Sequence, residues 1–248
     1  MITSPHNEKL KLVRRLRERR GRERDGLFLT EGEDMLEAGL ASGAEPRLLL
    51  SAAGSGIGGL EVEPQLLARF SALGSGTRVI AAWELRWATQ IEGPVCVYLH
   101  GVGDPANVGS VIRSAHALVA GTVVLGPGCA DPFSPKAVRA SMGSAFGQPL
   151  ARGTVADTPR PRLALLAHGG EVAASAWPPT PLTVCLGAER DGLPPEVLEA
   201  CQRTVTFPLR AGAESLNVAA AAAIVLQGIS SRPSRGRGAA TSEGERNG

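Results

Sequence analysis

The chain has 248 residues, of which 43% are hydrophobic and 20% charged, and its formal net charge is +2. It can bury a core and is long enough for two modest domains. No stretch approaches the ~18–20 apolar residues of a membrane-spanning helix, and no apolar leader is visible at the N-terminus. We therefore expect a cytoplasmic protein that does not span a membrane.

The four cysteines argue against a metal or redox centre. Cys96, Cys129, Cys185 and Cys201 are far apart and form no C-x-x-C pair. Zinc cages and thioredoxin-like sites need closely spaced cysteines. We predict no metal, and we expect these cysteines to be mostly buried small hydrophobic residues.

Positive charge is concentrated near the N-terminus. Residues 8–24 contain nine lysines and arginines but three glutamates. Leu10, Val13 and Leu16 have helical spacing, so residues 6–20 predict a helix with these three side chains docked and the arginines turned outward. This basic arm is suited to binding phosphates.

The first ninety residues predict a small α/β domain. Strands are expected at 27–30, 47–50 and 78–82, and helices at 33–42 and 64–73. No obvious catalytic cluster accompanies them. We assign residues 1–90 to this domain.

A second α/β series follows Gly93-Pro94 and occupies residues 91–230. The pattern predicts strands at 95–99, 122–125, 163–167, 182–186 and 205–209, and helices at 105–119, 134–146, 195–201 and 217–229. Residues 231–248 are rich in Pro, Gly, Ser, Arg and Glu and show no apolar periodicity, so this tail is predicted to be disordered.

A dinucleotide site is the first alternative to weigh. Residues 101–106 fit the loose pattern G-x-G-x-x-A between a strand and a helix. However, the next strand ends in Leu125-Gly-Pro-Gly128 and lacks the ribose-binding acid. Pro105 also removes a helix-start N–H that would hold a pyrophosphate. These features disfavour a nucleotide-dependent oxidoreductase.

Three polar motifs each fall between a predicted strand and a predicted helix. Residues 104–115 read DPANVGSVIRSA, residues 187–193 read GAERDGL, and residues 214–223 read ESLNVAAAAA. Open α/β sheets bind ligands at such junctions. The three motifs therefore predict one shared site.

Together the motifs resemble those of the SpoU (TrmH-type) RNA ribose 2'-O-methyltransferases of the SPOUT superfamily. The resemblance covers residues 94–229 and, more weakly, residues 4–85. It implies an α/β fold in which a SPOUT-type catalytic domain with a C-terminal trefoil knot follows a small L30e-like RNA-binding domain. It also implies a homodimer, S-adenosylmethionine as methyl donor and a ribose 2'-hydroxyl of structured RNA as acceptor.

The resemblance carries roles to particular residues. The catalytic set is Arg113, Asn107, Glu189, Ser215 and Asn217, and the cofactor-binding set is Gly187, Phe207, Leu216, Glu189 and Leu186. Ser215 is a good helix N-cap residue, and Gly187 lacks a Cβ, which lets the backbone turn and a flat ligand approach. A guanidinium is a poor base in water, since its pKa exceeds ~12. We therefore favour a positioning role for Arg113, and deprotonation by Arg113 stays open.

RNA contacts are expected from both domains, at Arg14, Arg15, Arg19, Arg20, Lys136 and Arg139. A solvated helix face is the other interpretation of Lys136 and Arg139. Ribosomal RNA is favoured over transfer RNA as substrate, and the modified nucleotide stays open. The alternative function is a catalytically silent RNA-binding module, against which the five catalytic residues argue together.

Overall fold

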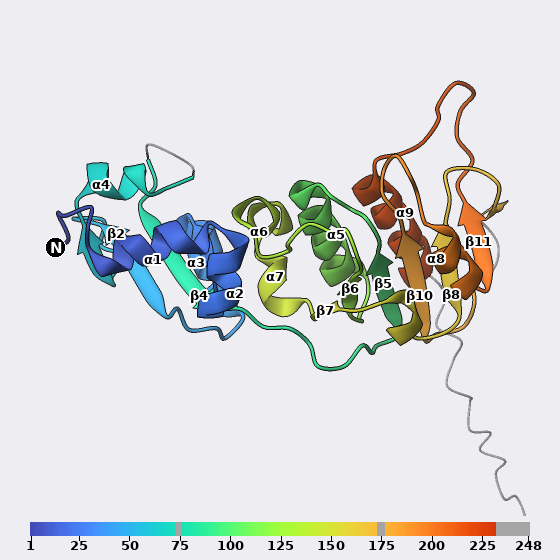
Figure 1. The fold of residues 1–248 in the computed structure, drawn as a ribbon, viewed down its shortest axis with the longest axis horizontal. Helices are drawn as coiled ribbons and strands as arrows, with labels where there is room; N and C mark the ends of the chain where they lie inside the picture. The colour runs from blue at the N-terminus through green and yellow to red at the C-terminus, as the bar shows by residue number, and fades with distance from the viewer. Residues whose placement is uncertain (73–75, 173–176, 232–248) are drawn as a thin grey trace, which may run out of the picture.

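The computed structural model describes residues 1–72, 76–172 and 177–231. Within them, two β-sheets with their helices follow one another along an elongated molecule (Figure 1). The predicted tail, apart from Ser231, lies outside the described residues, and so does Leu73 at the predicted end of a helix. No helix of the described ranges is both long and apolar enough to cross a bilayer.

The N-terminal part of the chain forms a four-stranded sheet of order β1-β4-β2-β3. The strands β1 and β2 each pair with β4 antiparallel, and β2 and β3 pair in parallel. The strands are β1 (Leu27–Glu31), β2 (Leu48–Ala52), β3 (Leu60–Val62) and β4 (Val79–Glu84), and the helices are α1 (Glu8–Leu16), α2 (Arg19–Asp25), α3 (Glu33–Ala41) and α4 (Pro64–Arg69).

The basic arm forms two helices, where the sequence predicted one. Leu10, Val13 and Leu16 of α1 are fully buried, as their spacing predicted. The break follows Leu16, and α2 starts at Arg19. Arg22 is 3% exposed, so the expectation that all the arginines turn outward was wrong for this residue. Its Nη1 donates to the carbonyls of Leu16 and Arg17 at 2.9 and 2.7 Å, which fastens α2 to the end of α1.

The second sheet has seven strands, all parallel, in the order β7-β6-β5-β10-β8-β11-β9. Parallel strands need crossovers and covered faces, which explains their continuous apolar runs. The strands are β5 (Val95–Leu99), β6 (Val123–Leu125), β7 (Leu150–Arg152), β8 (Arg162–Leu165), β9 (Glu171–Val172), β10 (Leu182–Leu186) and β11 (Arg203–Thr206).

Helices cover both faces of this sheet. On one face, Val97 and Leu99 of β5 join a core with residues of α5 and α9. On the other face, Tyr98 and Cys185 join a smaller core with Val197 of α8. The helices are α5 (Pro105–Leu118), α6 (Pro135–Ser141), α7 (Ser144–Gly147), the short 3-10 helix η1 (Val155–Asp157), α8 (Pro195–Ala200) and α9 (Val218–Ser230).

The helix predicted over 134–146 is interrupted after Ser141. Met142 and Gly143 have φ values of 48° and 84°, which end α6 in the left-handed region before α7 begins. A Cβ on Gly143 would lie 2.6 Å from the Cβ of Ala38 in α3. The turn therefore lets the two parts of the chain approach closely, a long-range reason that local periodicity does not contain.

Aromatic side chains fill the junction between the two sheets. Phe28 of β1 lies 5.2 Å from Phe133 and 5.5 Å from Phe146, measured between ring centroids. Trp83 of β4 meets Phe146 edge to face at 4.9 Å. Phe28 and Trp83 belong to the same buried core as the strands of the second sheet. The junction is thus packed as a protein interior.

Candidate active site

The carboxyl ends of β5 and β10 lie next to each other where the strand order changes direction. Leu99 pairs with Leu186 at these ends. From β5 the chain proceeds outward to β6 and β7, whereas β10 neighbours β8 and then β11 on the other side. Such a switch point leaves a crevice in which α/β proteins bind ligands. The loops toward α5 and toward α8 both leave from it.

Three residues from three different motifs form one hydrogen-bonded cluster there. Asn107 Nδ2 and Asn217 Nδ2 both donate to Glu189 Oε1, the latter at 3.1 Å. Asn217 Nδ2 also donates to Asn107 Oδ1 at 3.1 Å. We call Asn107, Glu189 and Asn217 the polar cluster. It holds together the start of α5, the loop after β10 and the start of α9.

Asp104 and Asn217 begin the two helices at this cluster. Asp104 accepts a hydrogen bond from the Ala106 amide at 2.9 Å, and Pro105 occupies the first helical position, where its missing N–H costs nothing. Lys136 Nζ donates to Asp104 Oδ1 at 2.8 Å. The hydrogen bonds from Lys136 and from the Ala106 amide lower the pKa of the Asp104 carboxyl, so it caps α5 in its charged form.

The N-cap of α9 is Asn217, not Ser215 as the sequence suggested. Asn217 Oδ1 accepts from the amides of Ala219 and Ala220 at 2.9 and 3.4 Å. Its side chain therefore caps α9 with the oxygen while its nitrogen donates within the polar cluster. Ser215 lies two residues earlier in the preceding loop, where it is exposed and lines the pocket described next.

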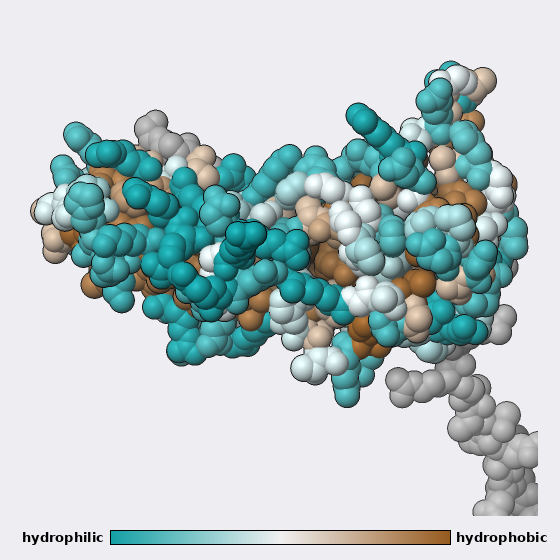
Figure 2. Space-filling model, viewed as in Figure 1, coloured by the Kyte–Doolittle hydropathy of each residue, from teal (hydrophilic) through white to brown (hydrophobic). Residues whose placement is uncertain are grey.

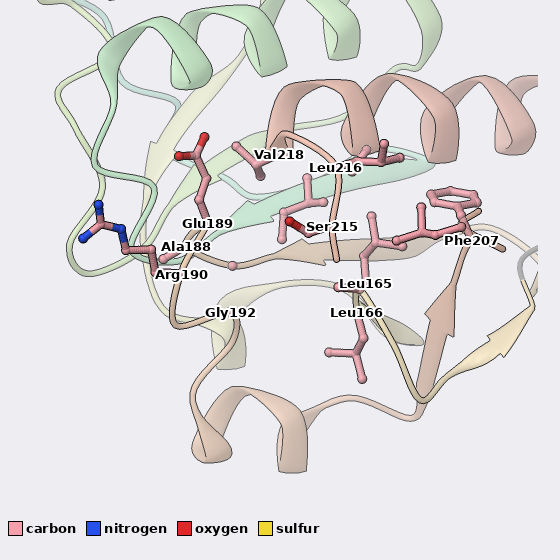
Figure 3. Close-up of a pocket in the computed structure, with 15 residues that line it drawn as sticks. Leu165, Leu166, Ala188, Glu189, Arg190, Gly192, Phe207, Ser215, Leu216 and Val218 are labelled. Carbon is pink, nitrogen blue, oxygen red and sulfur yellow. The ribbon is translucent and has the colours of Figure 1, made fainter. Parts of the chain in front are cut away.

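A cavity of about 180 Å³ opens beside the polar cluster. Figure 3 shows Glu189 and Arg190 at one end of it and Phe207 at the other. All five residues predicted to bind the cofactor line this cavity, although the role itself stays a prediction. The lining residues come from the ends of β8, β10 and β11 and from the start of α9: Leu165, Leu166, Ala167, Leu186, Gly187, Ala188, Glu189, Arg190, Gly192, Phe207, Leu209, Ser215, Leu216, Val218 and Ala221.

Gly187 is needed for close packing within its own loop, whereas the sequence suggested that it lets a flat ligand approach. A Cβ there would lie 2.2 Å from the carbonyl carbon of Gly192 and 2.5 Å from the Leu193 amide nitrogen. Ala188 and Gly192 exchange backbone hydrogen bonds of 3.1 and 3.0 Å, which closes the loop into a tight turn. Gly192 has φ +65° and open space around it. The turn holds Glu189 toward α5 and α9.

Two of the five predicted catalytic residues, Arg113 and Ser215, lie outside the polar cluster, and of these two Ser215 lines the cavity. The Arg113 side chain is exposed on α5 and makes no ion pair or hydrogen bond with residues of the described ranges. Six residues of α-helix separate it from Asn107, which corresponds to roughly 120° around the axis and about 9 Å along it. Arg113 is therefore available to a ligand that approaches the helix from solvent.

The predicted RNA-contact residues are mainly exposed but differ in their partners. Arg15 pairs with Asp25 at 3.2 Å and Arg19 with Glu23 at 3.1 Å. Arg14 lies over the ring of Phe70 at 5.2 Å. Arg20 and Arg139 are exposed and have no ion pair within the described part of the chain, whereas Lys136 is the partner of Asp104. Figure 2 shows hydrophilic residues gathered over α1 and α2.

The four cysteines are buried or partly buried, and three of them behave as small hydrophobic groups. Cys96 and Cys185 are buried, and Cys129 and Cys201 are partly buried. Burial raises the pKa of the Cys96 and Cys129 thiols. Burial also raises the pKa of Tyr98 to about 12. A raised pKa disfavours the reactive thiolate at Cys96 and Cys129. The Cys201 thiol differs, because its hydrogen bond with Cys185 lowers its pKa and raises that of Cys185. No group of metal-ligating side chains was found within the described ranges.

A family model described as the SpoU rRNA methylase family matches residues 94–227, which is more than half of the chain. The chain belongs to this family. A second model, described as an MRM3-like substrate binding domain, matches residues 7–81. The first match covers all three polar motifs, so the recognition drawn from those motifs is confirmed.

The curated relatives include chains of similar length and longer ones. An uncharacterized tRNA/rRNA methyltransferase of Mycobacterium bovis is 38% identical over 138 residues, covering 51% of this chain and 48% of the relative. This chain thus spans about half the length of that relative. The 23S rRNA (guanosine(2553)-2'-O)-methyltransferase RlmP of Bacillus subtilis is 29% identical, covering 91% of this chain and 97% of its own.

A solved rRNA methyltransferase structure confirms the α/β architecture. The AdoMet-bound rRNA methyltransferase of Sinorhizobium meliloti has a TM-score of 0.80 and 27% identity, covering 92% of this chain and 95% of its own. The likeness extends over both sheets, so it includes the junction between them.

Sequence reasoning missed the part of the pocket that follows β8. Leu165, Leu166 and Ala167 line the cavity but belong to none of the three motifs. They could have been found from the predicted strand at 163–167, because its carboxyl end lies at the same edge of a parallel sheet as the end of β10. Leu209, Arg190 and Ala221 also line the cavity. Arg190 and Ala221 belong to the second and third motifs but were not named as site residues, and Leu209 ends the predicted strand 205–209.

Proposed function

We propose that this protein transfers a methyl group from S-adenosylmethionine to a ribose 2'-hydroxyl of structured RNA. The observation that carries the proposal is the polar cluster beside the apolar cavity. Asn107, Glu189 and Asn217 come from three separated SpoU motifs and share hydrogen bonds at the mouth of one pocket. A motif match without such convergence would support the fold alone.

The cavity fits the chemistry of the proposed cofactor. Leu165, Leu186 and Phe207 offer apolar surface to a flat adenine ring. At the other end, Glu189 offers a carboxylate to a positively charged sulfonium or ammonium group. Gly187 and Ser215 complete the pocket around these two ends. Bound S-adenosylmethionine would supply an electrophilic methyl group, which leaves the protein to position the acceptor oxygen and handle its proton.

The polar cluster serves in this proposal as the positioning device. Both amide nitrogens donate to Glu189 Oε1, so the carboxylate is held in place while its second oxygen is left for a ligand. Ser215 adds a hydroxyl to the same wall. Fixed polar groups of this kind stabilise a transition state without having to reorganise.

Arg113 is proposed to act on the acceptor RNA. Its guanidinium is exposed on α5, where it can grip the phosphate or the 2'-oxygen through its planar fork. Arg113 could remove the proton of the 2'-hydroxyl only if bound RNA strongly changed the surroundings of its guanidinium group. We retain the positioning role as the proposal.

Finer features of the fold belong to the same proposal. We propose a trefoil knot at the carboxyl edge, supported by the convergence of the loops after β8, β10 and β11 on one pocket. We propose an L30e-like domain over residues 1–90 and a methyltransferase domain over residues 91–230, supported by the two family matches. We also propose a homodimer, as the family resemblance implies. We propose a cytoplasmic location, because the proposed substrate is a cytoplasmic RNA.

Ribosomal RNA is the proposed substrate class. The family description names rRNA, and so do the names of the relatives from Bacillus subtilis and Sinorhizobium meliloti. The basic arm and the MRM3-like match support binding of a structured RNA by the N-terminal part. The proposal does not extend to a particular nucleotide.

A calorimetric titration tests the proposed cofactor. S-Adenosylmethionine should bind with a stoichiometry of one per chain, and NAD should give no heat beyond dilution. Glu189→Gln should weaken the binding of S-adenosylmethionine because it removes the negative charge at one end of the pocket. Binding of NAD instead of S-adenosylmethionine would overturn the proposal.

A further inference from the structure

A second cavity lies at the junction of the two sheets, outside the proposed methyl-transfer site. Its volume is about 290 Å³, and it opens where β6 and β7 end. The loop from Leu125 to Pro132 forms one wall, Arg152 and Gly153 form another, and Arg19 and Trp87 close it from the N-terminal side. Neither the three motifs nor the family match assigns a role to this cavity, which we call the junction pocket.

Two arginines from distant parts of the chain converge at the junction pocket. Arg19 Nε and Arg152 Nη2 both donate to Glu23 Oε1, at 3.1 and 2.7 Å. The Arg152 guanidinium also lies over the ring of Trp87, 4.5 Å from its centroid. Both arginine side chains stay about half exposed, at 55% and 49%. One carboxylate therefore faces two cations, which leaves a net positive charge.

The neighbouring buried charges do not cancel this excess. Arg22 and Asp131 form their own pair at 2.6 Å, with exposures of 3% and 9%, and are mutually neutral. Phe133 meets Trp87 edge to face, with the ring centroids 5.1 Å apart, and helps to hold the indole in position. The junction pocket thus presents two accessible guanidinium groups beside an indole ring that is held in position.

The loop at Gly101 contacts both the junction pocket and the methyl-transfer site. The Gly101 amide donates to the Pro127 carbonyl at 2.9 Å, and a Cβ on Gly128 would lie 3.1 Å from the Gly101 Cα. On its other side Gly101 approaches Ala188, since a Cβ on Gly101 would lie 3.2 Å from the Ala188 Cβ. Strands are about 4.8 Å apart, and β6 lies two strands from β10. The nearest edges of the two pockets, at β6 and β10, are therefore roughly 10 Å apart.

We propose that the junction pocket binds a nucleotide of the same RNA strand, close to the ribose that is methylated. Arg19 and Arg152 would contact its phosphate, and Trp87 with the Arg152 guanidinium would stack on its base. This inference rests on the proposed function, because it takes RNA as the substrate. It adds a specific subsite, formed by both domains, to the general attraction of the basic arm.

The chemistry of the junction pocket matches this ligand. Guanidinium groups bind phosphate oxygens through paired hydrogen bonds, and aromatic rings and arginine planes stack on unpaired bases regardless of sequence. Exposed ion pairs such as those of Glu23 contribute little to stability, so a phosphate can replace the carboxylate at small cost. The cavity at a sheet edge also suits an unpaired nucleotide better than a duplex.

Charge-neutral substitutions test the proposal. The double variant Arg19→Gln, Arg152→Gln should bind an unmodified 23S rRNA transcript at least tenfold more weakly than the wild type. Its salt slope should become shallower by roughly 0.7–0.9 per lost phosphate contact. The matched control is Arg47→Gln, Arg78→Gln, which removes two exposed arginines that pair with Glu84 and Glu33. The control should keep its affinity for the transcript within twofold of the wild type.

Glu23→Gln separates phosphate binding from alignment of the two domains. It removes the negative charge that pairs with Arg19 and Arg152 but keeps both cations, so the affinity for the transcript should stay equal or rise. If Glu23→Gln weakens binding as strongly as the double arginine variant, the arginines act by holding the domains and the proposal is wrong. Unchanged affinity and salt slope in the double arginine variant would also overturn it, as would failure of the wild type to bind the transcript.

Two further readouts complete the experiment. Ultraviolet cross-linking of the wild type to the transcript should attach nucleotides to the peptide that contains Trp87, and the absence of such a cross-link would count against the stacking contact. S-Adenosylmethionine affinity, measured on every variant, should be unchanged. If the wild type binds RNA through the junction pocket but never methylates it, the proposed function fails, while the assignment of the junction pocket as an RNA-binding subsite stands.

Discussion

Asn217 Nδ2 donates a hydrogen bond to Glu189 Oε1 at 3.1 Å, and thereby joins the start of α9 to the loop after β10. The oxygen of the same side chain caps α9 through the Ala219 amide at 2.9 Å. One amide group thus links the stability of a helix to the geometry of the candidate site.

The two roles of Asn217 can be separated by substitution. Asn217→Ala should lower the free energy of unfolding by about 1 kcal/mol, the usual cost of losing an N-cap. Asn217→Ser should stay within a few tenths of a kcal/mol of the wild type, because serine caps as well as asparagine but does not carry the amide that donates to Glu189. Both variants should lose most of the methyl-transfer rate. Chemical unfolding and initial rates check this, and full activity of Asn217→Ser would contradict the role of the amide.

Arg113→Ala should abolish methyl transfer while the affinity for S-adenosylmethionine stays within twofold of the wild type. The reason is its position, since it is exposed on α5 and absent from the lining of the cavity. Arg113→Lys should fail as well, because an ammonium cannot reproduce the planar fork. Calorimetry and rate measurements test both variants. Turnover by the lysine variant would show that positive charge alone suffices.

Gly187 and Gly192 provide a matched pair in one turn. Gly187→Ala places a Cβ 2.2 Å from backbone atoms of Gly192, so the turn has to open and cofactor affinity should fall at least tenfold. Gly192→Ala meets no atom within 4 Å but keeps φ +65°, a strain of roughly 1–2 kcal/mol for a residue with a Cβ. Its affinity should fall less. Calorimetric titration with S-adenosylmethionine measures the affinity of both variants. A larger loss of affinity in Gly192→Ala than in Gly187→Ala would mean that the turn does not shape the pocket.

Arg22 and Asp131 should contribute strongly to stability as a pair. They are 109 residues apart in sequence and almost completely buried. Arg22→Ala leaves Asp131 buried without its cation, which should cost about 3–5 kcal/mol. Arg22→Ala combined with Asp131→Ala should recover part of this loss. A double-mutant cycle by chemical unfolding measures the coupling, and additive costs would show that the two charges do not depend on each other.

The sequence predicted the parts of the site that local patterns determine. Asn107, Glu189 and Asn217 each follow or begin an element with a clear periodicity, and parallel strands bring their ends to one edge. The five predicted cofactor residues line one cavity for the same reason. Their roles stay predictions, because position in a pocket does not measure binding or catalysis.

The features that escaped prediction depend on contacts between distant segments. Arg22 is buried because Asp131 reaches it across the domain junction, and Gly143 interrupts a helix where Ala38 approaches. Asn217 takes the cap expected of Ser215 because its amide also meets Glu189. Local spacing contains none of this information, since each case needs the three-dimensional neighbour.

The most direct test of the central claim is to identify the product. Unmodified 23S rRNA transcript is incubated with the protein and S-adenosylmethionine carrying a labelled methyl group, and the RNA is digested to nucleosides. The account predicts label in a single 2'-O-methylnucleoside, lost with Asn107→Ala and with Arg113→Ala. Label in a methylated base, or RNA binding with no label at all, would contradict it.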